Sequence, residues 1–170
     1  MIKKFFDSFS TTLYLQVWEH RIKVTDVSTG RTFDEVPNVK IVTNAKGEKI
    51  IAAIGNQANN TQEPNAVVVN PFSHPRTLLN DFLVAEKFLQ EAFKTLLGKK
   101  LFSPAPAVVI QLMEKTEGGL TLIEIRAFKE LALGAGARRV AVHQGDELSP
   151  RTIRFDQMVE AETSGLGTRT

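Results

Sequence analysis

The residue types that most often do chemistry are sparse in this chain. It contains no cysteine, which excludes thiolate metal ligands, disulfides and cysteine nucleophiles. Its three histidines, His20, His74 and His143, lie far apart without the spacing of metal ligands, so no metal site is expected. The carboxylate in the most distinctive context is Glu124, three residues after Thr121. A threonine and a glutamate at this spacing form the capping box that begins a helix, which predicts a structural role for Glu124.

Glu124 lies inside a predicted strand–helix–strand unit between Ala107 and Val142. The apolar run Val108–Leu112 indicates a buried strand, and the helix after Thr121 should end at the glycines from Gly134 onwards. Val140–Val142 is typical of a second short buried strand. Two parallel strands need a crossover of this length, so the pattern predicts an α/β core.

Strands and one long helix are predicted before this core. Pro37 lies within the third strand and requires an edge position or a bend there. Residues 44–70 are interpreted as a small insertion with two short strands, and a helix is expected from Pro75 to about Leu97. The three early strands, expected to be antiparallel, are Thr12–Trp18, Ile22–Asp26 and Thr32–Val42.

The chain is expected to divide into three parts. Residues 11–148 form one α/β domain with a mixed sheet, and residues 1–10 precede it as a separate segment. Residues 149–170 are mostly polar and are interpreted as a tail, from which Ile153 and Phe155 could cover an exposed face of the domain.

Residues 1–10 have the pattern of a short amphipathic helix. Their apolar residues recur at helical spacing, and two lysines lie off that face. Such a helix can lie in the headgroup layer of an anionic membrane, or its aromatic side chains can simply pack on the domain. The residues of the proposed membrane-binding segment are Ile2, Lys3, Lys4, Phe5, Phe6 and Phe9.

Composition limits the possible partners. The chain has 170 residues, 42% of them hydrophobic, and a net charge of +2. This charge gives no large basic field, so nucleic acid is not an expected partner. No apolar run is long enough to cross a bilayer, and the N-terminus does not read as a signal peptide.

Several segments, in order and at the right spacing, resemble the MreB family of bacterial actins. The resemblance covers roughly residues 1 to 143 and implies one half of an actin-like, ribonuclease H-like fold with a small inserted subdomain. It also implies that residues 1–10 are the family's membrane-binding helix. The matching segments within the domain are Asp34–Val39, Ala52–Ala58, Asp81–Leu89 and Gly134–Val140, together with Glu124.

The family's phosphate-binding hairpin is altered in this chain. Gln16 stands where the family has a metal-side aspartate, and Trp18 replaces a glycine that lets backbone amides approach phosphate. Glu19 adds a negative charge to the same turn. The family's second half, with its second phosphate loop and adenosine pocket, is expected to be absent, so no cofactor is expected. The degenerate loop comprises Gln16, Val17, Trp18, Glu19 and His20.

Two functional hypotheses follow from the resemblance. The first is a nucleotide-free structural or regulatory binding module of the membrane-associated actin cytoskeleton, linked to cell shape and not an enzyme. Its partners would be a full-length MreB-type filament or a second copy, and an anionic membrane surface, in the cytoplasm at the inner face of the membrane. Glu124, which polarises the attacking water in the family, would then be vestigial. The alternative is a weak or partner-completed ATPase.

Overall fold

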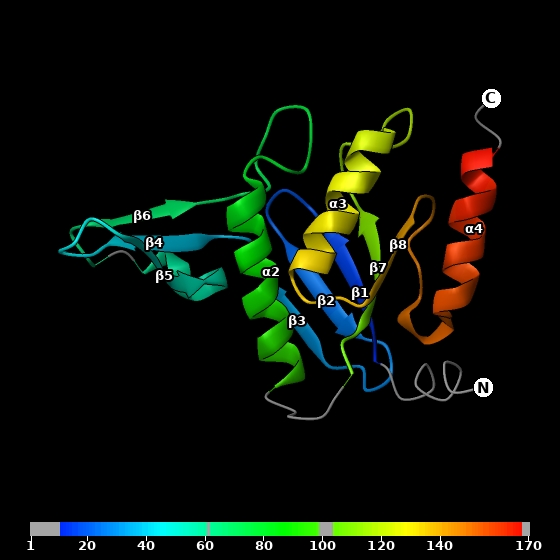
Figure 1. Ribbon diagram of the computed structural model, residues 1–170, viewed down its shortest axis with the longest axis horizontal. Helices are drawn as coiled ribbons and strands as arrows, with labels where there is room; N and C mark the ends of the chain where they lie inside the picture. The colour runs from blue at the N-terminus through cyan, green and yellow to red at the C-terminus, as the bar shows by residue number, and fades with distance from the viewer. Residues whose placement is uncertain (1–10, 61, 99–103, 168–170) are drawn as a thin grey trace.

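The protein consists of two β-sheets and three α-helices within the residues that the structure describes (Figure 1). This computed structural model describes residues 11–60, 62–98 and 104–167. The amphipathic segment proposed for residues 1–10 lies outside this range. Among the described residues, none of the helices combines the length and apolar character needed to cross a bilayer.

The larger sheet has five strands in the order β3-β2-β1-β7-β8. The first three strands along the chain form an antiparallel meander, and β1, β7 and β8 run parallel to one another. This mixed sheet confirms the fold class predicted from the sequence. Its strands are β1 (Thr12–Val17), β2 (Ile22–Asp26), β3 (Thr32–Glu35), β7 (Ala107–Leu112) and β8 (Arg139–His143).

A smaller sheet of three strands, in the order β5-β4-β6, projects from one side of the domain (Figure 1). Its strands are β4 (Val39–Thr43), β5 (Lys49–Ile54) and β6 (Ala66–Val69), with the short helix η1 (Gly55–Asn59) after β5. The single strand expected over Thr32–Val42 is therefore two strands in different sheets. Pro37 lies between them, and because proline lacks an N–H it cannot continue either ladder. The inserted unit consequently begins at β4, earlier than residue 44.

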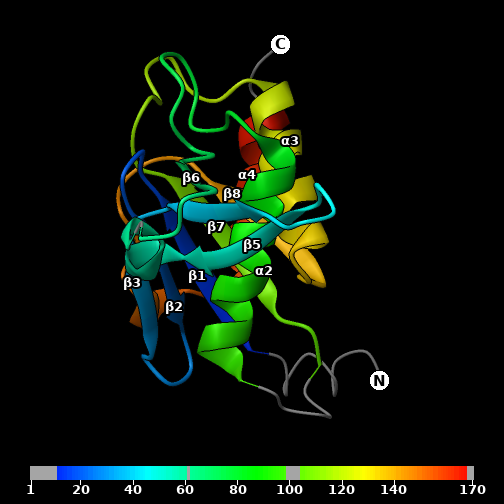
Figure 2. The same cartoon turned by 90° about the vertical axis from the view of Figure 1, so that its left-hand side faces the viewer.

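The larger sheet is packed on both of its faces. In the turned view the two helices of the main core lie together along one side of the strands (Figure 2). Alternate residues of a strand point to opposite faces. Leu13 and Leu15 of β1 share the main core with α2 (Phe82–Leu97) and α3 (Leu122–Gly134), while Tyr14 between them packs on the opposite side. The domain thus has three layers, with the sheet in the middle.

The long helix begins seven residues later than the sequence pattern predicts. Its first residue is Phe82, because Asp81 caps it by accepting a 3.1 Å hydrogen bond from the Val84 amide. The segment from Pro71 to Asn80 forms an irregular loop that buries Phe72 and Leu78. The apolar periodicity before Phe82 therefore reflects burial in a loop.

Residues 149–170, interpreted from the sequence as a polar tail, contain η2 (Pro150–Thr152) and α4 (Phe155–Gly167). Ile153 is buried against Tyr14 and Val109, and Phe155 and Met158 pack around the same cluster. This segment covers the second face of the sheet. The sequence signal is weak because only a few apolar residues make the contact.

Phe88 lies at the centre of the main core. It is fully buried on α2, with its ring centroid 5.9 Å from that of Phe33 and 6.3 Å from that of Phe72, both in edge-to-face geometry. These contacts join α2 to β3 and to the loop before the helix.

We therefore expect Phe88→Ala to lower the free energy of unfolding by about 3–5 kcal/mol, because it removes buried surface and leaves a cavity. The control is Leu83→Ala on the same helix, where the side chain is 72% exposed and the change should be within about 0.5 kcal/mol. Urea unfolding followed by circular dichroism measures both. Similar losses for the two variants would contradict the assignment of Phe88 to the core.

Candidate functional site at the carboxyl end of the parallel strands

The candidate site lies where β1, β7 and β8 end, next to the N-terminus of α3 (Figure 1). The carboxyl ends of parallel strands are the usual position for ligand sites in α/β sheets. A cavity of about 400 Å³ opens there. Its lining residues are Leu112, Thr116, Gly119, Leu120, His143, Gln144 and Gly145.

The turn between β1 and β2 is stabilised by contacts among its own residues and with β3. The Trp18 amide donates a 2.9 Å hydrogen bond to the Arg21 carbonyl, and the Arg21 guanidinium lies 5.0 Å from the centre of the Trp18 ring. Arg21 also forms a two-pronged ion pair with Asp34 of β3, at 2.7 and 2.6 Å. This pair raises the pKa of Arg21 and lowers that of Asp34. Trp18 is therefore held in place by Arg21, which is fixed in turn by its ion pair with Asp34 of β3.

Glu19 lies in the β1–β2 turn and contacts two other loops at this end of the sheet, the loop after β6 and the loop after β7. Its Oε2 lies 2.8 Å from Lys115 Nζ, and its Oε1 accepts a 2.8 Å hydrogen bond from the Ser73 hydroxyl. The Glu19 carbonyl accepts a 2.7 Å bond from Asn70, and its amide donates a 2.9 Å bond to Glu114. Lys115 and Ser73 lower the pKa of the Glu19 carboxyl, with Lys115 the larger cause. The negative charge expected to repel phosphate is thus already neutralised within the chain.

Lys115 contacts two other loops at this end of the sheet. Its side chain is only 21% exposed, and besides Glu19 it donates a hydrogen bond to the His74 carbonyl. Its backbone has a φ of 56°, which is uncommon for a residue other than glycine. The loop after β7 is held in this conformation by the contacts of the lysine side chain.

Gln16, at the end of β1, has a carboxylate partner from a distant loop. Its Nε2 donates a 2.7 Å hydrogen bond to Glu147 Oε1 and lies 3.8 Å from the Met113 sulfur. The uncharged amide is therefore accompanied by a carboxylate that follows β8. The sequence missed this arrangement because Gln16 and Glu147 are 131 residues apart.

A chain of partly buried hydrogen bonds also holds the loop after β8, which contains Glu147. The Tyr14 hydroxyl donates to Gln111 Oε1 and accepts a 3.3 Å bond from the Leu148 amide. Gln111 Nε2 donates to the carbonyls of Gly145 and Asp146, at 2.9 and 3.2 Å. Burial raises the pKa of Tyr14 to about 12, so its hydroxyl stays protonated and able to donate. Side chains from β1 and β7 thus hold residues 145–148 across the carboxyl end of the sheet.

The capping box predicted for α3 is present. Glu124 Oε2 accepts hydrogen bonds from the Thr121 amide at 2.8 Å and from its hydroxyl at 2.7 Å, and the Glu124 amide donates to the hydroxyl at 3.2 Å. Gln144 supports the turn before the helix by accepting a 2.8 Å bond from Leu120. Glu124 therefore has a structural role at the start of α3.

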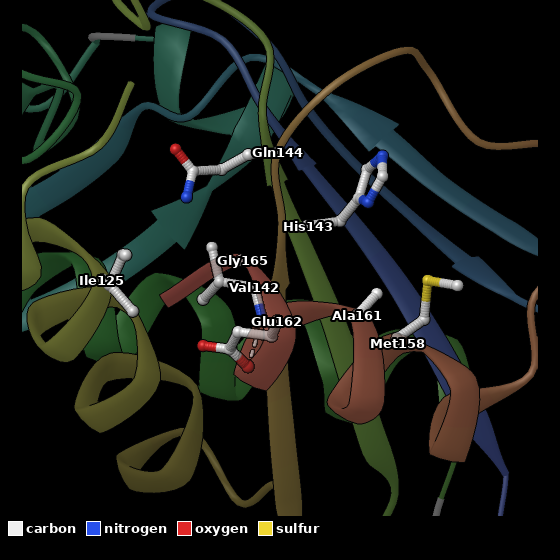
Figure 3. Close-up of a pocket in the computed structure, with 8 residues that line it drawn as sticks. All are labelled: Ile125, Val142, His143, Gln144, Met158, Ala161, Glu162 and Gly165. Carbon is white, nitrogen blue, oxygen red and sulfur yellow. Dashed lines mark hydrogen bonds between the residues drawn. The ribbon is translucent and has the colours of Figure 1, made fainter. Parts of the chain in front are cut away.

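A second cavity of about 270 Å³ lies along the free edge of β8, between α3 and α4 (Figure 3). Ile125 and Met158 approach it from the two helices. Glu162 of α4 points back to the strand, where Oε2 accepts a 3.3 Å hydrogen bond from the Val142 amide and Oε1 lies 2.6 Å from Lys129. The Glu162 carboxylate thus contacts both the Val142 amide and Lys129, and it covers an amide at the edge of β8 that would otherwise face outward.

The structure brings some predicted residues together and leaves others apart. Gln16, Trp18 and Glu19 lie at the same end of the sheet as Glu124, whereas His20 is exposed on the turn. His143 contacts the Asp146 carbonyl at 2.9 Å. In the described part of the chain, histidine and acidic residues form no group of three that could hold a metal ion.

Comparison with known proteins identifies the family. The chain is 31% identical over 144 residues to the cell shape-determining protein MreB of Escherichia coli strain K12, and equally identical to that of Haemophilus influenzae. These matches cover 82% of this chain. The chain is an MreB-like protein of the actin family. It spans about 40% of the length of the curated relatives it matches. No protein-family model matches it.

The fold of this MreB-like chain agrees with solved structures. Crystal structures of MreB5 of Spiroplasma citri bound to ADP and to AMPPNP match it with TM-scores of 0.59 and 0.60, at 18% and 17% identity. Each match covers 79% of this chain and 38% of the other. The resemblance and the half-actin fold predicted from the sequence are thus confirmed.

The conclusion that the chain is not an enzyme is wrong, because its relatives are MreB proteins, members of an actin-like ATPase family, and its structural neighbours hold nucleotides. That conclusion treated Gln16 and Glu19 as isolated residues. In the folded domain Lys115 neutralises Glu19, and Glu147 places a carboxylate beside Gln16. The substitutions therefore do not exclude nucleotide chemistry.

The lowered pKa of Glu19 has a testable consequence for stability. A carboxyl whose folded pKa is depressed stabilises the fold above its unfolded pKa of about 4.3, and this contribution is lost as the pH falls through the folded value. We expect Glu19→Gln to lower the urea midpoint at pH 7, and the difference from wild type to shrink as the pH falls below the unfolded pKa of the carboxyl towards its depressed folded pKa.

The matched control is Glu130→Gln, an exposed carboxylate on α3, which should leave the midpoint unchanged across the same range. Urea titrations of the three proteins between pH 3 and 7 make the comparison. Equal midpoints for wild type and Glu19→Gln at pH 7 would contradict a stabilising role for the contacts between Glu19 and the two other loops.

Proposed function

We propose that this chain is a structural assembly module of the membrane-associated bacterial actin cytoskeleton. It would join filaments of a full-length MreB-type protein or associate with itself, and so contribute to cell shape. The observation that carries this proposal is its similarity to cell shape-determining MreB proteins over 82% of the chain. The actin-like fold supports it independently.

We further propose that assembly does not depend on nucleotide. The support is that charged and polar side chains next to the cavity at the carboxyl end of the sheet already have partners within the chain. Glu19 takes the lysine and hydroxyl donors that could meet a phosphate, and Trp18 fills the turn under Arg21. Residues 145–148 are held across the same end. A domain tied together in this way can keep its shape without a ligand.

The proposed site of action is the cytoplasmic face of the membrane, reached through residues 1–10. That segment joins β1 at the amino end of the parallel strands, whereas the candidate site lies at their carboxyl end. Attachment of the segment to lipid would therefore leave the loops around Glu19 accessible.

A weak or partner-completed ATPase is the second candidate. It is favoured by the ADP and AMPPNP bound to the structural neighbours, and by the 400 Å³ cavity beside the Glu124 helix terminus. In this case a partner would supply the remaining walls of a nucleotide site.

Co-pelleting with filaments of full-length E. coli MreB separates the two candidates. We expect the chain to pellet with filaments to the same extent with and without added ATP and Mg²⁺, because polar side chains next to the cavity at the carboxyl end of the sheet already have partners within the chain. Trp18→Gly, which opens the turn, should behave the same. The chain alone, without filaments, is the pelleting control.

Absence from the filament pellet would contradict the assembly role. A several-fold dependence on ATP, with saturable calorimetric binding of ATP to the chain below roughly 100 micromolar, would instead establish the second candidate.

The membrane role predicts that wild type sediments with anionic liposomes and that Phe6→Asp does so several-fold less. Burial of each phenylalanine contributes at best about 1.5–3 kcal/mol, and ordering of a short helix offsets part of this. Binding should therefore be reversible. Phe102→Asp, outside the proposed segment, is the control for the added charge. Equal sedimentation of wild type and Phe6→Asp would exclude residues 1–10 as the anchor.

A further inference from the structure

The inner face of α4 is poorly filled for a helix that covers a sheet. The residues of α4 that line the 270 Å³ cavity beside β8 are spaced along one face of the helix, and they are Met158, Ala161, Glu162 and Gly165 (Figure 3). Only Met158 among these four is large and apolar. A Cβ added at Gly165 would have no atom of α3 or β8 within 4 Å. None of residues 155–165 is buried, so α4 lies on the sheet without tight packing.

A buried carboxylate is the main attachment of α4 beyond its first turn. The Glu162 side chain is only 8% exposed, and it contacts Lys129 of α3 and the Val142 amide of β8. The contact with Lys129 is an ion pair that lacks the angles of a hydrogen bond. At the start of the helix Asp156 lies 3.0 Å from Arg139, but the Asp156 side chain is 78% exposed. An exposed pair of this kind contributes little to stability, so Glu162 is the contact that matters most.

The second half of α4 has a low intrinsic preference for the helical conformation. Thr163, Ser164 and Gly165 follow one another, and all three residue types disfavour a helix interior. The Thr163 and Ser164 hydroxyls each donate a 2.9 Å hydrogen bond to the carbonyl four residues earlier, which destabilises a helix slightly. A segment with few packed contacts and low helix preference opens more readily than the core.

The surface beneath α4 has a definite chemistry of its own. Ile125 of α3 and Val142 of β8 form an apolar floor. Two basic side chains flank this floor, Lys129 on α3 and Arg139 at the start of β8. The α4 sequence is complementary, because it contains three acidic residues and no lysine or arginine. Charge complementarity of this kind selects and orients a binding partner. The groove therefore suits an acidic helix with one apolar face.

We propose that α4 is an autoinhibitory helix, which covers a docking groove for an acidic amphipathic helix of a partner protein. The partner helix places a carboxylate where Glu162 lies, between Lys129 and the Val142 amide. Larger apolar residues at the positions of Ala161 and Gly165 fill the cavity that α4 leaves. Ile153, just before α4, is buried and is the fixed point from which the helix moves away. The inference does not rest on the proposed function, because it involves neither MreB filaments nor lipid.

Fluorescence anisotropy with a labelled peptide tests the proposal on the full chain. The probe is the sequence of residues 155–167 with Ala161→Leu and Gly165→Leu, which keeps the carboxylate and adds the missing apolar bulk. A groove that is only partly open lowers the apparent affinity in proportion to its open fraction. We expect Glu162→Gln to bind the probe several-fold more tightly than wild type, because this variant loses the ion pair with Lys129. The matched control is Glu160→Gln, an exposed residue of α4, which should behave as wild type.

The opposite change in the chain should close the groove. Ala161→Leu adds apolar bulk to the chain's own helix, so the probe should bind this variant several-fold more weakly than wild type. Equal affinities for wild type, Glu162→Gln and Ala161→Leu would overturn the proposal, as would the absence of saturable binding. Sedimentation equilibrium checks whether α4 of a second copy takes the groove instead. A dimeric Glu162→Gln chain would establish that exchange and would also overturn the proposal.

Charge reversal shows whether the probe binds in this groove. Lys129→Glu repels the chain's own Glu162, so the groove should open. This variant should bind a probe carrying Glu162→Lys more tightly than the original probe, whereas wild type should show the reverse order. The same order for both proteins would place the probe elsewhere and contradict the proposal. Circular dichroism checks that each variant is folded. If Lys129→Glu is unfolded, the comparison of Glu162→Gln with Ala161→Leu decides the matter.

Discussion

The structure depends on the parallel pairing of β1 with β7 at the centre of the larger sheet. Six consecutive residue pairs, from Thr12 opposite Ala107 to Val17 opposite Leu112, join two segments about 95 residues apart in the chain. Every residue of β7 is buried, because helices lie on both faces of the sheet. The meander before β1 and the crossover after β7 are both attached to this pair. The loops that follow the two strands consequently meet at one end of the sheet.

Their meeting explains why residues of no obvious chemical importance form the candidate site. Glu19 follows β1 and Lys115 follows β7, so the strand pairing itself places their side chains within 2.8 Å. The same pairing sets Gln16 beside Gln111, and both reach the loop after β8. Partly buried polar groups of this kind are stable only when each has a partner. The polar groups of the three loops satisfy one another.

The edges of the two sheets are covered by different means. The larger sheet is protected at both edges, by acidic residues on β3 and by the Glu162 carboxylate on β8. In the smaller sheet β5 carries a register shift, and the Ala66 amide at the start of β6 donates to the Glu63 carbonyl. Asn70, directly after β6, bonds the Glu19 carbonyl and so ties the smaller sheet to the loops at the carboxyl end of the larger one.

The sequence by itself determined the elements whose signals are local. Strict alternation predicted β1 and β2, the apolar run predicted β7, and Thr121 with Glu124 predicted the start of α3. The quoted segments also identified the family, since their order and spacing do not depend on contacts between them. Local signals were weaker at Pro37, where one expected strand proved to be two, and before Phe82, where a loop buries apolar residues.

Only the tertiary structure decided the partners of the charged and polar side chains. Lys115 neutralises Glu19 from 96 positions away in the sequence, and Glu147 reaches Gln16 from 131 positions away. Residues 149–170 were interpreted as a tail because they are mostly polar. In the structure a few apolar contacts, such as that of Ile153 with Tyr14, fix α4 against the sheet. The physical reason is the same in each case. A charge or an apolar side chain acts through what lies next to it, and for these residues the neighbours are set by the pairing of distant strands.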